Sequence, residues 1–265
     1  MTGTGTERYG ERMFSHGHDA ELDRLHGLAG ALDDGSFRRL ARLPIREDWR
    51  CLDIGAGLGT VTRWLARRCP RGRVVAMDRD IRLLSVLDDR TGWEAVESDV
   101  TREDFPAGGF DLIHARWLFA HLPSRDAVLE RVVRWLAPGG WLVIEDLARF
   151  PLESSPHPLY RKVSLAICDA VINRIGTDPA WARTFPAPLR PLGLTDLGSE
   201  TSLPAVGPTP MGRFWRRSGE QLAADLTGQL GITEAELAEF GELVESPDFH
   251  DLCLATVAAW GRRPE

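Results

Sequence analysis

The stretch Leu52-Asp53-Ile54-Gly55-Ala56-Gly57-Leu58-Gly59-Thr60 (LDIGAGLGT) places three glycines at alternate positions directly after a short apolar run. Glycine lacks a β-carbon, so its backbone adopts positive φ angles easily and can approach a ligand closely. Between a strand and a helix, such a loop offers backbone N–H groups to anionic or polar atoms. A tight turn without a ligand would use the same residues, so the loop by itself is weak evidence for a nucleotide-like cofactor.

Short apolar runs alternate with amphipathic stretches from about residue 49 onward. Five of the runs have the length of a strand: Cys51–Ile54, Arg73–Met77, Trp93–Glu97, Phe110–His114 and Trp141–Glu145. This alternation predicts βαβ units and a parallel sheet of α/β class, with a ligand site beyond the carboxyl ends of the strands. We expect a helix to open at Thr60 or Val61, and Pro138-Gly139-Gly140 to end the helix that precedes the fifth strand.

Two aspartates follow the next two predicted strands. Asp78 ends the second strand, about 20 residues past the glycines, where a carboxylate accepts hydrogen bonds from ribose hydroxyls in folds of this topology. Asp99 ends the third strand, where it could accept from the exocyclic amine of adenine while Val100 covers the ring. Each aspartate alone would equally suit a solvated strand end or a turn. Together with the glycine loop they predict a nucleotide-like cofactor.

The spacing of the glycines argues against a nicotinamide dinucleotide. The dinucleotide fingerprint GxGxxG needs glycine at position 60, and the residue there is threonine. The pattern present is instead Gly55-x-Gly57-x-Gly59.

With these motifs in place, residues from about 13 to 262 resemble the class I S-adenosylmethionine-dependent methyltransferases, in particular their small-molecule, natural-product branch. The resemblance rests on LDIGAGLGT, on FDLIHARWLFAHLP and on LERVVRWLAPGGWLVIED. It implies S-adenosyl-L-methionine as the cofactor and a first helix, beginning in Gly17–Leu25, that closes over it. The implied cofactor-binding residues are Asp53, Gly55, Ala56, Gly57, Asp78, Arg79, Asp99, Val100, His114, Ala115 and Arg116.

The later part of the chain completes the expected fold. We predict a helix over Leu159–Ile175, a strand over Gly193–Ser202, helices over Arg213–Leu230 and Thr233–Glu245, and a last antiparallel strand over Leu252–Trp260. With the resemblance, this gives a Rossmann-like, doubly wound α/β fold with a seven-stranded, mostly parallel sheet. We expect one domain, 1–265, divided into an N-terminal helical lid (1–48), a cofactor-binding core (49–150), a helical substrate cap insertion (151–192) and the C-terminal part of the core (193–265).

Composition excludes several kinds of protein. A net charge of −7 argues against nucleic acid as a partner, because that binding depends on clustered positive charge. No apolar run approaches the roughly 20 residues that span a bilayer, so we expect a cytoplasmic protein without a membrane partner, as a monomer or homodimer. The four cysteines show no CxxC spacing and suggest neither a zinc site nor a redox pair. His16 and His18 have no acidic or cysteine partner at ligand spacing, so we expect no metal.

The most concrete function is methyl transfer to a small, apolar or aromatic secondary-metabolite acceptor at oxygen. The alternative is a protein of the same fold that binds S-adenosylmethionine without methylating and assists a rearrangement or cyclisation. A hydroxyl acceptor would need a base, and the candidates are Asp146, at the end of the fifth strand, and His121, after the fourth. A capping aspartate and a packed histidine remain the alternatives for these two residues.

Overall fold

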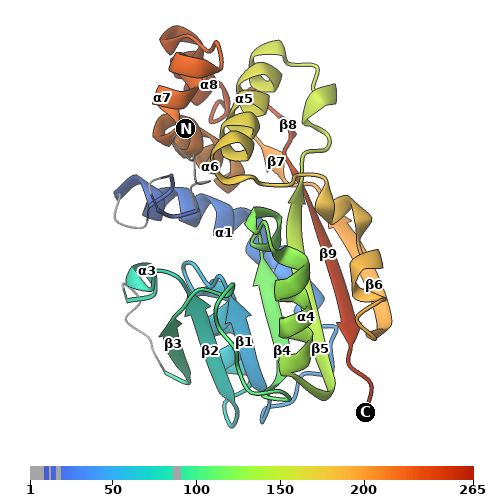
Figure 1. Cartoon of the computed structure of the whole chain (residues 1–265). Helices are drawn as coiled ribbons and strands as arrows, with labels where there is room; N and C mark the ends of the chain where they lie inside the picture. Colours follow the sequence, from blue (N-terminus) through green and yellow to red (C-terminus); the bar gives the residue numbers. More distant parts are fainter. Residues whose placement is uncertain (1–8, 12, 16–18, 86–90) are drawn as a thin grey trace, which may run out of the picture. The chain divides into compact units, whose positions relative to one another are not determined.

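The computed structural model of the chain describes residues 9–11, 13–15, 19–85 and 91–265 (Figure 1). They form two compact units. The first comprises the described parts of 1–32 together with 148–179 and 203–255, and the second comprises the described parts of 33–147 together with 180–202 and 256–265. The helix α1, Asp19–Leu40, begins in the first unit and ends in the second.

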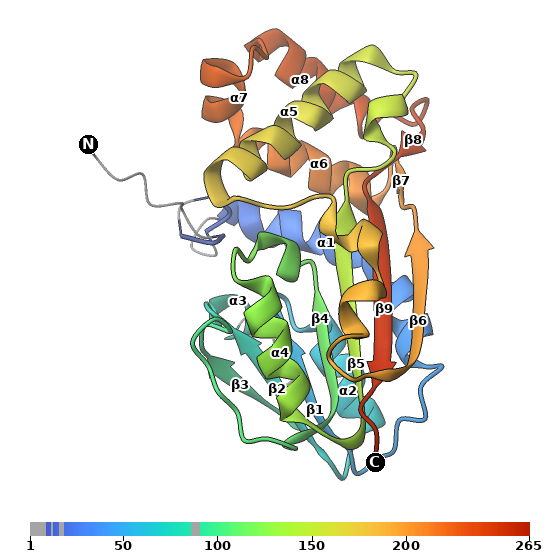
Figure 2. The same ribbon diagram turned by 45° about the vertical axis from the view of Figure 1, so that its right-hand side comes forward.

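The second unit is built on a seven-stranded sheet with the order β3-β2-β1-β4-β5-β9-β6. Figure 2 shows β9 between β5 and β6. The first five strands pair in parallel, and β6 pairs antiparallel with β9. Their bounds are Arg50–Ile54 (β1), Arg73–Asp78 (β2), Trp93–Glu97 (β3), Phe110–Arg116 (β4), Leu136–Ala148 (β5), Thr195–Ser202 (β6) and Ala255–Arg262 (β9). This confirms the predicted fold class.

Helices cover both faces of this sheet. One face packs against α2 (Thr60–Arg68) and the end of α1, through a core that includes Val61, Leu65 and Leu40. The helix α4 (Arg125–Trp135) lies on the other face (Figure 1). Because both faces are covered, the central strands are almost continuously buried, as in other parallel sheets. Shorter elements here are α3 (Arg82–Ser85) and the 3-10 turns η1 (Phe119–His121), η3 (Trp181–Thr184) and η4 (Ala187–Leu189).

Two cysteines of this core lie in contact, which their sequence spacing did not suggest. Cys51 is in β1 and Cys69 caps the C-terminus of α2, and their sulfur atoms are 3.6 Å apart. Both are free thiols and buried. The contact arises because α2 returns antiparallel to β1 and brings residues 18 positions apart together, a relationship that CxxC spacing does not describe.

The first unit is mainly helical. It contains α5 (Pro158–Ile175), α6 (Pro210–Gln221), α7 (Ala223–Gln229) and α8 (Glu234–Leu243), the turn η2 (Leu152–Ser154), and a ribbon of β7 (Ala205–Val206) with β8 (Asp251–Leu252). Its core holds Tyr160 stacked on Phe240, and Trp215. Thr233 and Glu236 form a capping box at the start of α8.

Several predicted element bounds change. The helix expected over Arg213–Leu230 is two helices, because the buried Leu222 has a non-helical backbone, with φ −100° and ψ 9°. The strand expected from Leu252 begins at Ala255, and β5 already begins at Leu136 and includes Pro138-Gly139-Gly140, with a register irregularity opposite β4. The expected cap is divided: residues 151–179 belong to the first unit and 180–192 to the second.

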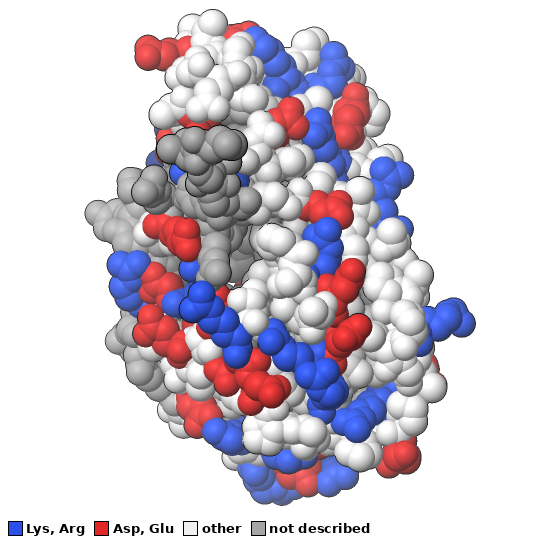
Figure 3. Space-filling view, in the orientation of Figure 1, with Lys and Arg blue, Asp and Glu red and all other residues white. Residues whose placement is uncertain are grey.

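The described residues were searched for membrane-spanning helices, metal-binding groups and patches of one charge. No helix among them is long and apolar enough to cross a bilayer. Over the same residues, no group of three or more His, Cys, Asp or Glu side chains is arranged to hold a metal ion, and His16 and His18 lie outside them. On the face shown in Figure 3, basic and acidic side chains are interspersed.

Candidate functional site

The glycine loop joins β1 to α2 at the carboxyl edge of the sheet. Gly55, Gly57 and Gly59 all have positive φ angles, of 69°, 54° and 66°, which side chains disfavour. The backbone N–H groups of Gly55 and Ala56 donate to the carbonyl of Met77 at the end of β2, at 2.8 and 3.1 Å. The helix α2 begins directly after the loop, at Thr60, as predicted.

The space beside Gly57 is open. A β-carbon built on Gly57 would have no heavy atom within 4 Å, whereas one on Gly55 would meet the side chain of Leu118 at 3.4 Å. Asp78, the last residue of β2, points to this loop and accepts the Gly57 N–H at 2.9 Å. The loop therefore presents bare backbone, with a half-buried carboxylate next to it.

Asp99 and Val100 follow β3. Asp99 lies two residues past the end of the strand, not at its end, and its Oδ1 accepts from the backbone N–H and the hydroxyl of Thr101, at 2.8 and 2.7 Å. Its Oδ2 is 3.9 Å from Nε of Arg79. Val100 is buried. The structure thus places the predicted residues Arg79, Asp99 and Val100 on neighbouring carboxyl ends, in a turn that also has a local structural use for Asp99.

Asp53 and His114 are buried against one another beneath the glycine loop. They are register partners on β1 and β4, and Asp53 Oδ1 is 2.8 Å from His114 Nδ1. The hydroxyl of Thr62 donates to Asp53 Oδ2 at 2.7 Å. The side chains of Asp53 and His114 are therefore engaged with each other inside the protein.

Glu145, which is not among the predicted site residues, lies next to His114 in the same buried cluster. Its Oε1 is 3.5 Å from His114 Nε2, an ion pair longer than a good hydrogen bond. Its Oε2 accepts from Arg39 at 2.5 Å and from the hydroxyl of Ser36 at 3.0 Å. Arg39 and Ser36 come from the last turns of α1, so this helix is tied to the fifth strand by a buried ion pair.

These contacts shift the pKa values of both central groups. Burial works to lower the pKa of His114, but the carboxylates of Asp53 and Glu145 outweigh it and raise that pKa above its ordinary value. Burial works to raise the pKa of Glu145, but the positive charges of His114 and Arg39 outweigh it and lower that pKa to about 2. Along this cluster the acidic side chains of Asp53 and Glu145 alternate with the basic side chains of His114 and Arg39.

Arg116 and Ala115 end the fourth strand with opposite orientations. Arg116 donates to Asp33 Oδ1 and to the hydroxyl of Ser36, each at 2.9 Å. Ala115 is buried on the other face of β4. The Arg116 side chain is therefore directed to α1, and Asp33 of α1 also accepts from the hydroxyl of Thr60, at 2.9 Å.

The two candidate bases lie on adjoining elements. Asp146 is in β5 and is 1% exposed, and its two oxygens accept the backbone N–H groups of Ala120 and Leu147, at 2.8 and 2.9 Å. Burial raises the pKa of Asp146 to about 7, which those hydrogen bonds offset only in part. His121 ends the turn η1, directly after Ala120. Glu145 and Asp146 are consecutive in β5, and their side chains point to opposite faces of the sheet, as the two-residue period of a strand requires.

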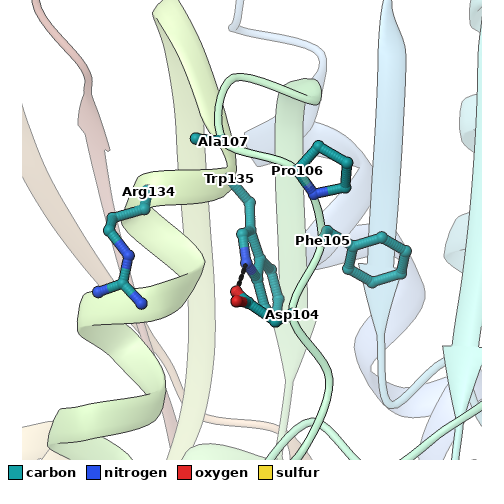
Figure 4. Close-up of a pocket in the computed structure, with 6 residues that line it drawn as sticks. All are labelled: Asp104, Phe105, Pro106, Ala107, Arg134 and Trp135. Carbon is teal, nitrogen blue, oxygen red and sulfur yellow. Dashed lines mark hydrogen bonds between the residues drawn. The ribbon is translucent and has the colours of Figure 1, made fainter.

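A hollow of about 290 Å³ lies near the amino ends of β4 and β5, at the edge of the sheet opposite the glycine loop. Figure 4 shows it between the segment that precedes β4 and the end of α4. It is lined by Asp104, Phe105, Pro106, Ala107, Arg134 and Trp135. The indole of Trp135 donates to Asp104 at 3.2 Å. None of the predicted site residues lies here, so this hollow is separate from the glycine loop.

Comparison with known proteins agrees with the geometry of the loop. Residues 52–144 match the family model of a methyltransferase domain. Methyltransferase str3 of Strobilurus tenacellus is 32% identical over 133 residues, which are 49% of this chain and 46% of that protein. Methyltransferase GfsG of Streptomyces halstedii is 26% identical over 245 residues, which are 88% of this chain and 83% of that protein. The chain thus spans less than half the length of str3.

A solved structure has the same fold. It is phosphoethanolamine N-methyltransferase 2 of Haemonchus contortus in complex with S-adenosyl-L-methionine, with a TM-score of 0.63 and 15% identity over 98% of this chain and 61% of that chain. At this identity the likeness shows the fold alone.

Proposed function

We propose that the chain is a class I S-adenosylmethionine-dependent methyltransferase, which binds S-adenosyl-L-methionine at the glycine loop and transfers its methyl group to a small-molecule acceptor. The observation that supports this most directly is the pairing of open space beside Gly57 with the carboxylate of Asp78. The residues around that loop are assigned below to the parts of the cofactor that they could bind.

The residues present fit this cofactor. A nucleoside needs an acceptor for its two ribose hydroxyls, and Asp78 provides a carboxylate at the end of β2. The methionine part needs room close to the backbone, and Gly57 provides it, because no side chain obstructs the space beside that residue. The adenine would lie on the β3 side, with Asp99 accepting from its amine and Val100 covering the ring.

The remaining assigned positions are proposed to contribute mainly through their backbone. They are Asp53, Ala56, Arg79, His114, Ala115 and Arg116. For Asp53, His114 and Arg116 the support is that their side chains already have partners in the protein.

Bound S-adenosylmethionine supplies a methyl group activated by a sulfonium. The chain itself would orient the acceptor in line with that methyl group and exclude water, which accounts for most of the catalysis of such a displacement. No metal is needed for this chemistry.

We further propose that the acceptor is apolar or aromatic and is methylated at oxygen. The support comes from the part of the cap segment in the second unit. Its Trp181 lies 5.9 Å from Phe119 and 4.7 Å from Phe185, between ring centroids, beside the turn that Asp146 holds. For a hydroxyl acceptor, Asp146 is the proposed base, with His121 as the second candidate, because a pKa near 7 suits proton transfer at neutral pH.

The test is to incubate the purified full chain with S-adenosylmethionine and a panel of phenols, alcohols, carboxylic acids and amines. Mass spectrometry would detect S-adenosylhomocysteine together with a product 14 Da heavier than its acceptor, and we expect both with a phenol or alcohol. Calorimetry would measure cofactor binding separately. Binding without product from any acceptor class would favour the alternative, in which the bound cofactor assists a rearrangement or cyclisation. An absence of binding would refute the proposal.

A further inference from the structure

Asp33 joins the two segments of the second unit that border the glycine loop. One oxygen of its carboxylate, Oδ1, accepts from the hydroxyl of Thr60 and from the guanidinium of Arg116, each at 2.9 Å. Thr60 is the first residue of α2 and follows Gly59 directly, and Arg116 is the last residue of β4. Asp33 itself lies in α1.

The two ends of the loop are held by different contacts. At its beginning, the N–H groups of Gly55 and Ala56 are fixed to the carbonyl of Met77 in β2. At its end, the backbone contacts are local: the Gly59 N–H donates to the carbonyl of Ala56, the Gly59 carbonyl accepts the N–H of Arg63 in α2, and Gly59 has a positive φ. Without restraints, a segment with three glycines has more backbone conformational freedom than one with any other residues at those positions. The Thr60 hydroxyl is the side-chain group nearest in sequence that can restrain the end of the loop.

The support is anchored firmly. The side chains of Arg116 and Asp33 are only 13% and 19% exposed, so their charge-assisted contact is partly shielded from water. Arg116 also donates to Ser36, which donates to the buried Glu145. The position of Asp33 is therefore fixed by the same helix that is tied to β5, and Thr60 is held against a rigid part of the sheet.

We propose that Asp33 is a positioning residue for the cofactor loop: it fixes the start of α2 relative to the end of β4, so that the Gly55–Gly59 backbone is ordered before a ligand arrives. This deepens the proposed function and rests on it for the identity of the ligand. It does not require that Asp33 touch the cofactor. Preorganisation of this kind increases affinity because less ordering remains to be done on binding.

The first measurement does not use the cofactor. Hydrogen exchange on the free chain should show faster exchange of the amides of residues 57–61 in Asp33→Ala than in the native chain. The matched control is Asp34→Ala, the exposed neighbouring aspartate on the same helix, which should leave those amides unchanged. Equal exchange in Asp33→Ala and the native chain would overturn the proposal, whatever the ligand is.

The second measurement is the dissociation constant for S-adenosylmethionine by calorimetry. We expect Asp33→Ala to raise it about 5- to 30-fold, the equivalent of losing one to two hydrogen bonds. Asp33→Asn, which keeps an oxygen for Thr60 but loses the charge toward Arg116, should have a smaller effect. In an acceptor assay, KM for the cofactor should rise while kcat changes little. Unchanged affinity in Asp33→Ala would overturn the proposal.

A double-mutant cycle tests the route through Thr60. Thr60→Val removes the hydroxyl, and its effect should not add to that of Asp33→Ala, because both changes remove the same contact. Full additivity would contradict the proposal. If Asp33→Ala does not fold, hydrogen exchange of residues 57–61 is measured on Thr60→Val alone, with the same expected result. If the native chain does not bind S-adenosylmethionine, the proposed function fails, and the exchange measurement still decides the role of Asp33.

Discussion

The backbone N–H of Ala120 donates to the carboxylate of Asp146 at 2.8 Å, so the fifth strand holds the short turn that ends at His121. The two candidate bases identified from sequence are thereby coupled: removing the Asp146 carboxylate releases the segment that carries His121. Activity measurements at Asp146 must separate proton transfer from this anchoring.

The pH dependence of the rate separates the two roles. If Asp146 removes the acceptor proton, the rate with a phenol or alcohol should rise with pH through about 7, where its carboxylate ionises. Asp146→Asn should lower kcat by about 10²- to 10⁴-fold and remove that rise. The measurement is kcat against pH at saturating cofactor. An Asn variant that loses activity but keeps the pH profile would identify anchoring as the role of Asp146.

The raised pKa of Asp146 also predicts how stability varies with pH. A carboxyl whose folded pKa lies above its unfolded value favours the folded state when protonated, and that contribution is lost as pH rises through the folded value. Between pH 4 and pH 8 the contribution should fall by up to about 4 kcal/mol, because the carboxyl has a pKa of about 7 in the folded chain and about 4 in the unfolded chain. Urea unfolding at these two pH values should show a smaller difference for Asp146→Asn than for the native chain. If the free energy of unfolding has the same pH dependence in both proteins, the pKa of Asp146 is not raised.

Asp78→Ala should weaken binding of S-adenosylmethionine by about 1.5 to 3 kcal/mol, the cost of losing charge-assisted hydrogen bonds to a partly buried partner. Asp80→Ala is the matched control, since the Asp80 carboxylate pairs with the exposed Arg82. Calorimetry on both variants makes the comparison. Equal affinities in Asp78→Ala and the native chain would remove Asp78 from the site.

Gly57→Val should reduce cofactor affinity by more than about tenfold, because its side chain would enter the open space beside the loop. The backbone strain at φ 54° should also cost about 1 to 3 kcal/mol of stability. Gly108→Val controls for that strain: Gly108 has φ 73° and open surroundings but lies before β4, away from the loop. Gly108→Val should lose a similar amount of stability and keep its affinity for S-adenosylmethionine. If both variants bind equally well, the loop does not contact the cofactor.

Glu145→Gln should destabilise the fold by about 3 to 5 kcal/mol, because it leaves the buried Arg39 and His114 without their shared counter-charge. Glu200→Gln, at the more exposed partner of Arg39, is the control and should cost about 1 kcal/mol or less. Since the pKa of Glu145 is lowered to about 2, its stabilising contribution is present above the unfolded value and is lost as pH falls toward 2. Chemical denaturation near neutral pH compares the variants.

The sequence was sufficient for features that depend on local pattern. The glycine loop, the start of α2 at Thr60 and the position of Asp78 at the end of β2 each depend on the residues immediately around them, and the structure has each as predicted. The opposite orientations of Glu145 and Asp146 also follow from the sequence, because the side-chain period of a strand is two.

Features that depend on distant segments were not readable. The pairing of Asp53 with His114 requires the register between β1 and β4, and the role of Glu145 requires the packing of α1 against β5. The contact of Cys51 with Cys69 and the interruption at Leu222 likewise reflect how elements pack, which propensity and spacing do not encode.

The strand order has a consequence for how proteins of this kind diversify. All the residues proposed for the cofactor lie between Asp53 and Arg116, on strands β1 to β4 and the loops that follow them, while β6, β9 and residues 180–192 come much later in the chain. The proposed cofactor residues and the segment proposed to contact the acceptor therefore occupy separate stretches of the sequence. A substitution after residue 180 leaves every residue proposed for the cofactor unchanged.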